Sequence, residues 1–235
     1  SRVRGGEILG RDGRLQLVVA RRDEQGRVSD VTRDVQFRVD MPGIVAVDDT
    51  GMATPLANGK VTLTAVDAEG GTAETTVVVS DFDDDRLVSF PSQVVPIFTK
   101  MGCNGGGCHG KASGQNGFRL SLLGFGPLED HARLVSESRG RRIFPAAPDR
   151  SLLLLKATGE APHGGGKRLD RDSHEYRLLR RWIAQGAPYS DGDEPELLDI
   201  EVVPSERTST PLATQQLAVI AHYSDGTTED ITRAA

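Results

Sequence analysis

The stretch QLVVARRDEQGRVSDVTR at residues 16–33 recurs without a gap as QLAVIAHYSDGTTEDITR at residues 216–233. Around the start of the first copy, Leu15, Leu17 and Val19 recur at every second position. A period of two is typical of a half-buried β-strand, and a glycine after such a run indicates a turn. The repeat therefore predicts the same β-structure in two places. The residues shared by the two copies are, in the first, Gln16, Leu17, Val19, Gly26, Asp30, Thr32 and Arg33.

Further short strands are predicted through the first 80 residues. Val35, Phe37 and Val39 alternate in the same way, and apolar runs follow at residues 44–47, 61–66 and 75–79. Short strands at this spacing predict an antiparallel β-sandwich. The turns between the strands are marked by Gln25-Gly26, Asp49–Gly51, Asn58-Gly59 and Gly70-Gly71.

The repeated pattern resembles the bacterial immunoglobulin-like (group 2) domains that are strung along surface and secreted proteins. The resemblance implies an immunoglobulin-like β-sandwich at residues 1–86 and the start of a second one at residues 191–235. A sandwich of this kind needs about 100 residues. We therefore expect the chain to be a piece of a longer protein with further domains.

Composition narrows the class of protein. Hydrophobic residues make up 37% and charged residues 26% of the 235 residues, which is ordinary for a soluble globular protein. The net charge is -6 and no basic stripe stands out, so we expect no nucleic-acid partner. No stretch approaches the roughly 20 apolar residues that span a bilayer, so we expect no membrane span.

The segment at residues 87–190 changes from the strand period toward the helical one, and it is dense in glycine. A last helix is the clearest, with an N-cap at Asp172 or Ser173, a stop at Gly186 and one apolar stripe. We predict an all-α domain here, which makes the chain a multi-domain protein with β-structure on both sides. The other predicted helices are residues 92–101 and 151–157, and the apolar stripe consists of Tyr176, Leu179, Trp182 and Ile183.

The sequence GCNGGGCHG at residues 102–110 holds both cysteines of the chain, five positions apart, and a histidine follows the second. The common haem c attachment signal is C-x-x-C-H, and this is the wider C-x₄-C-H. In such a site Cys103 and Cys108 bind the two haem vinyl groups and His109 binds the iron. Two alternatives stay open at this point: a disulfide between the two cysteines, or a Zn²⁺ site with His163 or His174 as fourth ligand.

The middle segment resembles the cytochrome c-like domain of large planctomycete proteins of unknown function. The resemblance rests on VVPIFTKMGCNGGGCHG at 94–110, NGFRLSLLGFGPLED at 116–130, GRRIF at 140–144, PDRSLLLLKATGEAPHGGGKRL at 148–169 and EYRLLRRWIAQGAP at 175–188. It implies one covalent haem c and a first helix packed on the last. Arg141, Arg142, Lys167 and Arg168 are candidate partners of the haem propionates, because guanidinium groups suit carboxylates.

The second iron ligand is predicted to be His163. Met41 and Met52 belong to the β-region, and Met101 lies two residues before Cys103 on the wrong side of the attachment. His163 lies in the loop APHGGGKRL, where the resemblance places the distal ligand. His131 and His174 are weaker candidates that we expect at the surface, and an open or water-ligated iron is the remaining alternative.

These features predict an extracytoplasmic electron-transfer protein, in the periplasm or on the cell surface. It would transfer single electrons to an unidentified redox partner and would not be an enzyme. The alternative function is a structural or adhesive spacer with a Cys103–Cys108 disulfide and no haem. A haem enzyme or sensor would need an open distal site.

Overall fold

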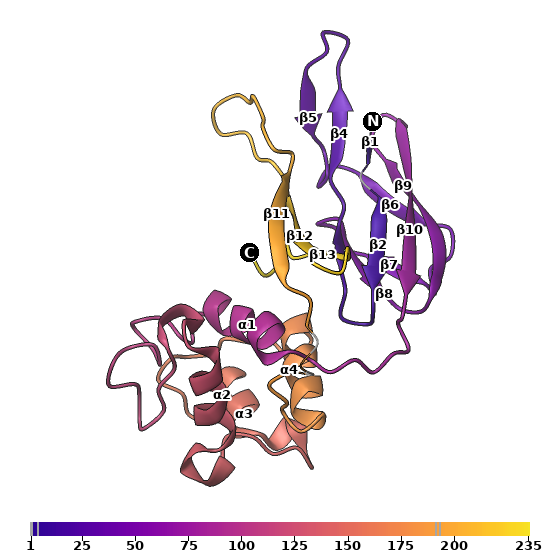
Figure 1. Cartoon of the computed structure of the whole chain (residues 1–235). Coiled ribbons are helices and arrows are strands. Elements are labelled where there is room, and N and C mark those ends of the chain that lie inside the picture. Colours follow the sequence, from indigo (N-terminus) through magenta and orange to yellow (C-terminus); the bar gives the residue numbers. More distant parts are fainter. Residues whose placement is uncertain (1, 4, 191, 193) are drawn as a thin grey trace. The chain divides into compact units, whose positions relative to one another are not determined.

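The computed structural model describes residues 2–3, 5–190, 192 and 194–235, and the chain divides into two compact units. The β unit comprises Ser1–Asp85 and Pro195–Arg233 with Ala235, and the middle unit comprises Arg86–Glu194 with Ala234. Figure 1 shows the helices in the middle unit, coloured magenta to orange, and the labelled strands in the β unit.

The predicted fold class, immunoglobulin-like β-sandwiches with an all-α cytochrome c-like domain, is wrong. The structure is mainly β-rich with only 20% helix, in four short helices, and its strands are divided among several small sheets. Glycine is the physical reason in the middle unit. Gly102, Gly114, Gly117 and Gly124 adopt positive φ values of 61° to 78°, a conformation that ends helices.

Among its described residues, the β unit contains four sheets of three or four strands. Their orders are β1-β4-β5, β2-β10-β9-β6, β3-β8-β7 and β11-β12-β13. The largest sheet is antiparallel except where β10 runs parallel to β2. The strands are β1 Arg2–Val3, β2 Gly6–Leu9, β3 Leu15–Gln16, β4 Val19–Arg22, β5 Val28–Asp30, β6 Gln36–Val39, β7 Val45–Val47, β8 Met52–Pro55, β9 Gly59–Val66, β10 Thr72–Ser80, β11 Leu197–Val203, β12 Ala218–Tyr223 and β13 Thr228–Asp230.

Residues shared by the two repeats make the same local contacts in both copies. The Asp30 Oδ1 atom accepts hydrogen bonds from the Thr32 amide at 3.0 Å and the Thr32 hydroxyl at 2.6 Å. That hydroxyl oxygen accepts in turn from the Val19 amide at 2.8 Å. In the second copy, Asp230 and Thr232 repeat the pair of contacts at 3.1 and 2.6 Å. The repeated sequence thus encodes a repeated strand-end hydrogen-bond pattern.

The middle unit contains the four α-helices among the described residues: α1 Val95–Lys100, α2 Pro127–Val135, α3 Leu152–Ala157 and α4 His174–Ala184. A π-helical turn at Phe90–Val94 precedes α1, and single 3₁₀ turns lie at Leu122–Gly124, Glu137–Gly140 and Pro148–Arg150. The predicted cap of the last helix is confirmed, since the Ser173 hydroxyl accepts from the Tyr176 amide at 3.1 Å.

The core of the middle unit joins the start of α1 to α4. Phe90, Phe98 and Trp182 are each at most 4% exposed, and the Phe90 and Trp182 ring centres are 5.5 Å apart. The indole N–H of Trp182 donates to the Pro188 carbonyl at 2.8 Å, so the ring is buried with its polar atom satisfied. This core gives the following loops a fixed base.

Candidate functional site

The loop after α1 folds tightly enough to bring its two ends together. The Cys103 amide donates to the last turn of α1 at the Phe98 carbonyl, 2.8 Å away. The His109 amide then donates back to the Cys103 carbonyl at 3.0 Å. A β-carbon at position 110 would collide with the carbonyl oxygen of Asn104, so only glycine fits there. The predicted attachment loop therefore closes on itself and holds His109 beside Cys103.

The two cysteines are both free thiols in the structure. Burial raises the pKa of the Cys103 thiol to about 11, against the opposing effect of the Arg168 charge. The Arg168 side chain lies beside the loop, with Nη1 donating to the Met101 carbonyl at 3.3 Å and Nη2 3.9 Å from the Cys108 Sγ atom. A cation thus lies against the segment that carries both thiols.

The His109 ring is held by the backbone of a neighbouring hairpin. Its Nδ1 atom is 3.1 Å from the Phe118 carbonyl oxygen, and the Phe118 ring centre is 4.7 Å from its own. Because a carbonyl only accepts, Nδ1 carries the hydrogen and Nε2 keeps its lone pair. Burial lowers the pKa of His109, which favours the same neutral form. The ring is prepared to bind a metal through Nε2.

His163 is held in the same way by its own turn. Its Nδ1 atom is 2.8 Å from the Gly166 carbonyl oxygen, which again leaves Nε2 with the lone pair. The turn is tied to α3, because the Lys156 ammonium donates to the Pro162 carbonyl at 2.7 Å. Gly165 leaves room for the ring, since a β-carbon there would lie 3.0 Å from the His163 Cε1 atom.

The His109 and His163 rings are nearly parallel. Their planes differ by 6° and their centres are 6.3 Å apart. The two rings are stacked, toward the long end of the range for paired aromatic rings. The two histidines that the sequence singled out therefore lie close together in the structure.

A cavity of about 690 Å³ connects these groups, within the size range of ligand pockets. Its lining is apolar with four cations, and the lining residues that the structure describes include no Asp or Glu. Three of the four predicted propionate partners, Arg141, Arg142 and Arg168, line the cavity. The fourth, Lys167, does not line it and is ion-paired with Asp170. The lining includes Cys103, Cys108, His109 and His163, the cations Arg141, Arg142, Lys156 and Arg168, and Phe98, Phe118, Leu120, Leu134, Leu152 and Leu153.

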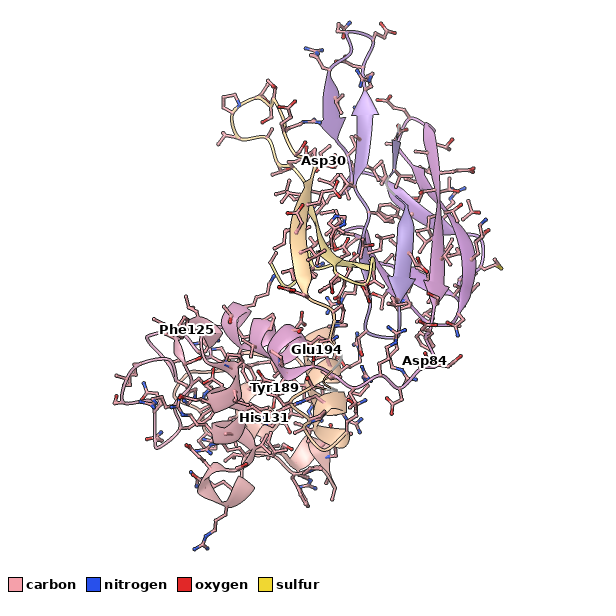
Figure 2. All side chains as sticks on the ribbon, viewed as in Figure 1. Asp30, Asp84, Phe125, His131, Tyr189 and Glu194 are labelled. Atoms are coloured by element: carbon pink, nitrogen blue, oxygen red, sulfur yellow. The ribbon has the colours of Figure 1, made fainter. Side chains whose placement is uncertain are left out.

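The other candidate ligands lie elsewhere. His131 was expected at the surface, but it is half-buried, with Nε2 2.8 Å from the Ala187 carbonyl oxygen and its ring 5.5 Å from that of Tyr189. Figure 2 shows both side chains inside the middle unit. His174 is the first residue of α4. Neither histidine lines the cavity, and neither does Met101.

Sequence reasoning missed the role of the hairpin that holds His109. The Phe118 carbonyl accepts both the His109 ring and the Gln115 amide, the latter at 2.8 Å. Every residue has a backbone carbonyl, so the residue type does not show which carbonyl will bind a histidine ring. The only sequence signal is Asn116-Gly117, a turn pair that places Phe118 opposite Gln115.

The geometry does not favour the zinc alternative. Across the described ranges, no three His, Cys, Asp or Glu side chains are grouped closely enough to hold a metal ion, whereas structural zinc needs four ligands.

Within the same described ranges, no helix is long and apolar enough to cross a membrane.

Comparison with known proteins leaves the site to be interpreted on its geometry. No protein-family model matches the chain, and no curated protein is significantly similar to it.

Proposed function

We propose that the middle unit binds one covalent haem c through Cys103, Cys108 and His109, and transfers single electrons outside the cytoplasm. The observation that carries the proposal is that Cys103, Cys108, His109 and His163 line one cavity, each imidazole with its Nδ1 atom on a backbone carbonyl. Haem, when bound, supplies a one-electron iron couple whose potential the axial ligands set.

The cysteines fit the covalent attachment. Each S–H group would add across one vinyl double bond to form a thioether, with no atom lost. The loop closure between Cys103 and His109 places thiol and imidazole on one wall of the cavity. The raised pKa of Cys103 keeps its thiol protonated until reaction, so a reactive thiolate is rare there.

The cavity fits the remainder of the group. An apolar lining suits a flat macrocycle, and a wall with four cations and no described acid suits its two propionates. Arg141 is the cation most available for this, because it is exposed and has no hydrogen bond or ion pair among the described residues. Arg168 lies beside the attachment loop and offers a second.

His163 completes the proposed coordination. If His109 and His163 both held the iron, they would leave no open position for a substrate, so we propose an electron carrier rather than an enzyme. Two imidazoles favour ferric iron more than imidazole with a thioether does, so the potential is expected to be low. The resemblance of the flanking repeats to domains of surface and secreted proteins supports a place in the periplasm or on the cell surface. The redox partner is expected to be another protein.

The test is a reduced-pyridine absorption spectrum of the denatured full chain, made in a bacterial periplasm with cytochrome maturation machinery. We expect a c-type band that stays with the denatured chain, and its loss in the Cys103→Ser/Cys108→Ser double variant. Absence of haem in the wild type, together with no titratable free thiol, would overturn the proposal in favour of a disulfide-closed spacer.

A further inference from the structure

Arg142 is a buried cation in the wall of the cavity. It is 5% exposed, and its guanidinium group donates to backbone carbonyls of three separate segments. Nη1 donates to the Arg133 carbonyl at 2.7 Å and the Glu137 carbonyl at 3.1 Å. Nη2 donates to the Gly117 carbonyl at 3.1 Å and the Ser138 hydroxyl at 3.2 Å. One side chain thus joins the end of α2, the turn after it and the hairpin at Gly117.

This arrangement is costly for the fold. Buried arginines are normally paired with carboxylates, yet Arg142 forms no ion pair with any Asp or Glu that the structure describes. The turn that it joins is strained as well, since Ser138 and Arg139 adopt φ values of 55° and 62°. Each such residue is strained and persists only where surrounding contacts impose its conformation. The guanidinium supplies those contacts.

The same guanidinium lies against the group that holds His109. Its central carbon is 4.5 Å from the centre of the Phe118 ring, and it binds the carbonyl of the preceding residue, Gly117. Phe118 in turn offers its carbonyl to the His109 Nδ1 atom and its ring to the His109 ring. Arg142 therefore fixes Phe118 through the preceding peptide group and through its ring.

We infer that Arg142 is a positioning residue for His109: it fixes the Phe118 carbonyl and so holds the imidazole in the Nδ1–H tautomer, with Nε2 directed to the cavity. As a statement about iron binding, this rests on the proposed function. As a statement about the tautomer, it stands on the haem-free chain alone. Groups that orient a metal-binding histidine affect metal affinity about 10- to 100-fold when they are removed.

The first experiment reads the tautomer by nitrogen NMR of the reduced, haem-free full chain, at a pH where His109 is neutral. In the wild type we expect a single form with a protonated Nδ1 atom. In Arg142→Met we expect both tautomers. Arg142→Lys keeps the charge but cannot reach three segments at once, so we expect it to resemble Met. Arg150→Met, which removes an exposed cation outside the cavity lining, is the matched control and should resemble the wild type.

The second experiment titrates each reduced protein with ferric haem. The expected result is an affinity about 10- to 100-fold weaker in Arg142→Met and Arg142→Lys than in Arg150→Met. No haem binding by the wild type would refute the proposed function and leave the tautomer result standing. A single Nδ1–H tautomer in either folded Arg142 variant would refute the positioning role.

Folding is checked by circular dichroism. If both Arg142 variants unfold, the wild type decides the question through the scalar coupling across the hydrogen bond between the His109 Nδ1 atom and the Phe118 carbonyl carbon. An observed coupling, together with Phe118→Leu losing the single tautomer, supports the role. Absence of the coupling, or an unchanged tautomer in folded Phe118→Leu, overturns it.

Discussion

The His109 and His163 rings are oriented by the same kind of hydrogen bond, but the two acceptors are held by different parts of the structure. Each ring puts Nδ1 on a backbone carbonyl, His109 on that of Phe118 and His163 on that of Gly166. For His109 the acceptor lies nine residues away in a separate hairpin, backed by buried Arg142. For His163 it lies three residues away in the same exposed turn. One ring is held by tertiary structure and the other by a local turn.

This difference predicts different roles for the two histidines as proposed iron ligands. A ring fixed by packed neighbours loses little entropy on binding, so His109 suits the permanent ligand beside the thioethers. A ring in a short turn could shift if the proposed iron changed its oxidation state. The proposed distal ligand is thus the replaceable one, and the comparison can be tested by removing each ring in turn.

The largest expected effect separates the two histidines directly. His109→Ala removes the ligand next to the attachment cysteines, and we expect covalent haem in the periplasmic product to fall at least tenfold. His163→Ala should keep most of the covalent haem but convert the iron from low-spin to high-spin, because one axial position opens. The measurements are haem per chain and the visible spectrum. Equal loss of haem in both variants would contradict the assignment.

A second prediction concerns the space around each ring. Gly110→Ala places a β-carbon against the Asn104 carbonyl, which is backbone and cannot swing away. We expect a loss of about 3 kcal/mol in the free energy of unfolding, at the upper end of overpacking costs. Gly165→Ala meets only the movable His163 ring, so we expect less than about 1 kcal/mol. Urea unfolding of the two haem-free variants measures both, and a reversed order would show that the His163 turn is the more rigid.

The contrast between local and tertiary contacts also explains how much of the fold could be predicted from the sequence. The strand period at residues 35–39 and 61–66, and the Ser173 cap, identify elements that form because their signals are local. The all-α prediction failed because helix length depends on where glycines turn the chain, and a dense glycine pattern does not fix those places. Four short helices joined by long turns have the same composition as a small bundle.

For the site, the sequence indicated side chains but not their supports. Cys103, Cys108, His109 and His163 all line one cavity. Arg142 could be named as a cation near the haem, yet its three backbone acceptors come from distant segments with no distinguishing residue type. The sequence likewise does not indicate that the Phe118 carbonyl accepts a hydrogen bond from the His109 ring. What orients a ligand is therefore harder to predict here than the ligand itself.

A third prediction uses pH to test the burial of His109. Because the folded-state pKa is below the unfolded value of about 6.5, the unfolded chain takes up a proton first as the pH falls. The stabilising contribution is therefore complete above about pH 6.5 and is lost as the pH falls toward the folded-state pKa. Urea unfolding of the haem-free chain should show this slope, and His109→Gln should reduce it. His222→Gln, in the β unit, is the control, and a slope unchanged by His109→Gln would contradict the prediction.

The smallest expected effect concerns the support of His163. Lys156→Met removes the ammonium that donates to the Pro162 carbonyl, an exposed contact that contributes about 0.5 kcal/mol to stability. If a local turn holds the ring, the His163 tautomer should survive this change, since its acceptor is Gly166. Nitrogen NMR of the variant should therefore show an unchanged His163 and faster amide exchange at residues 163–166. A mixed tautomer would instead make Lys156 the counterpart of Arg142, and both rings would then depend on a cation outside their own loops.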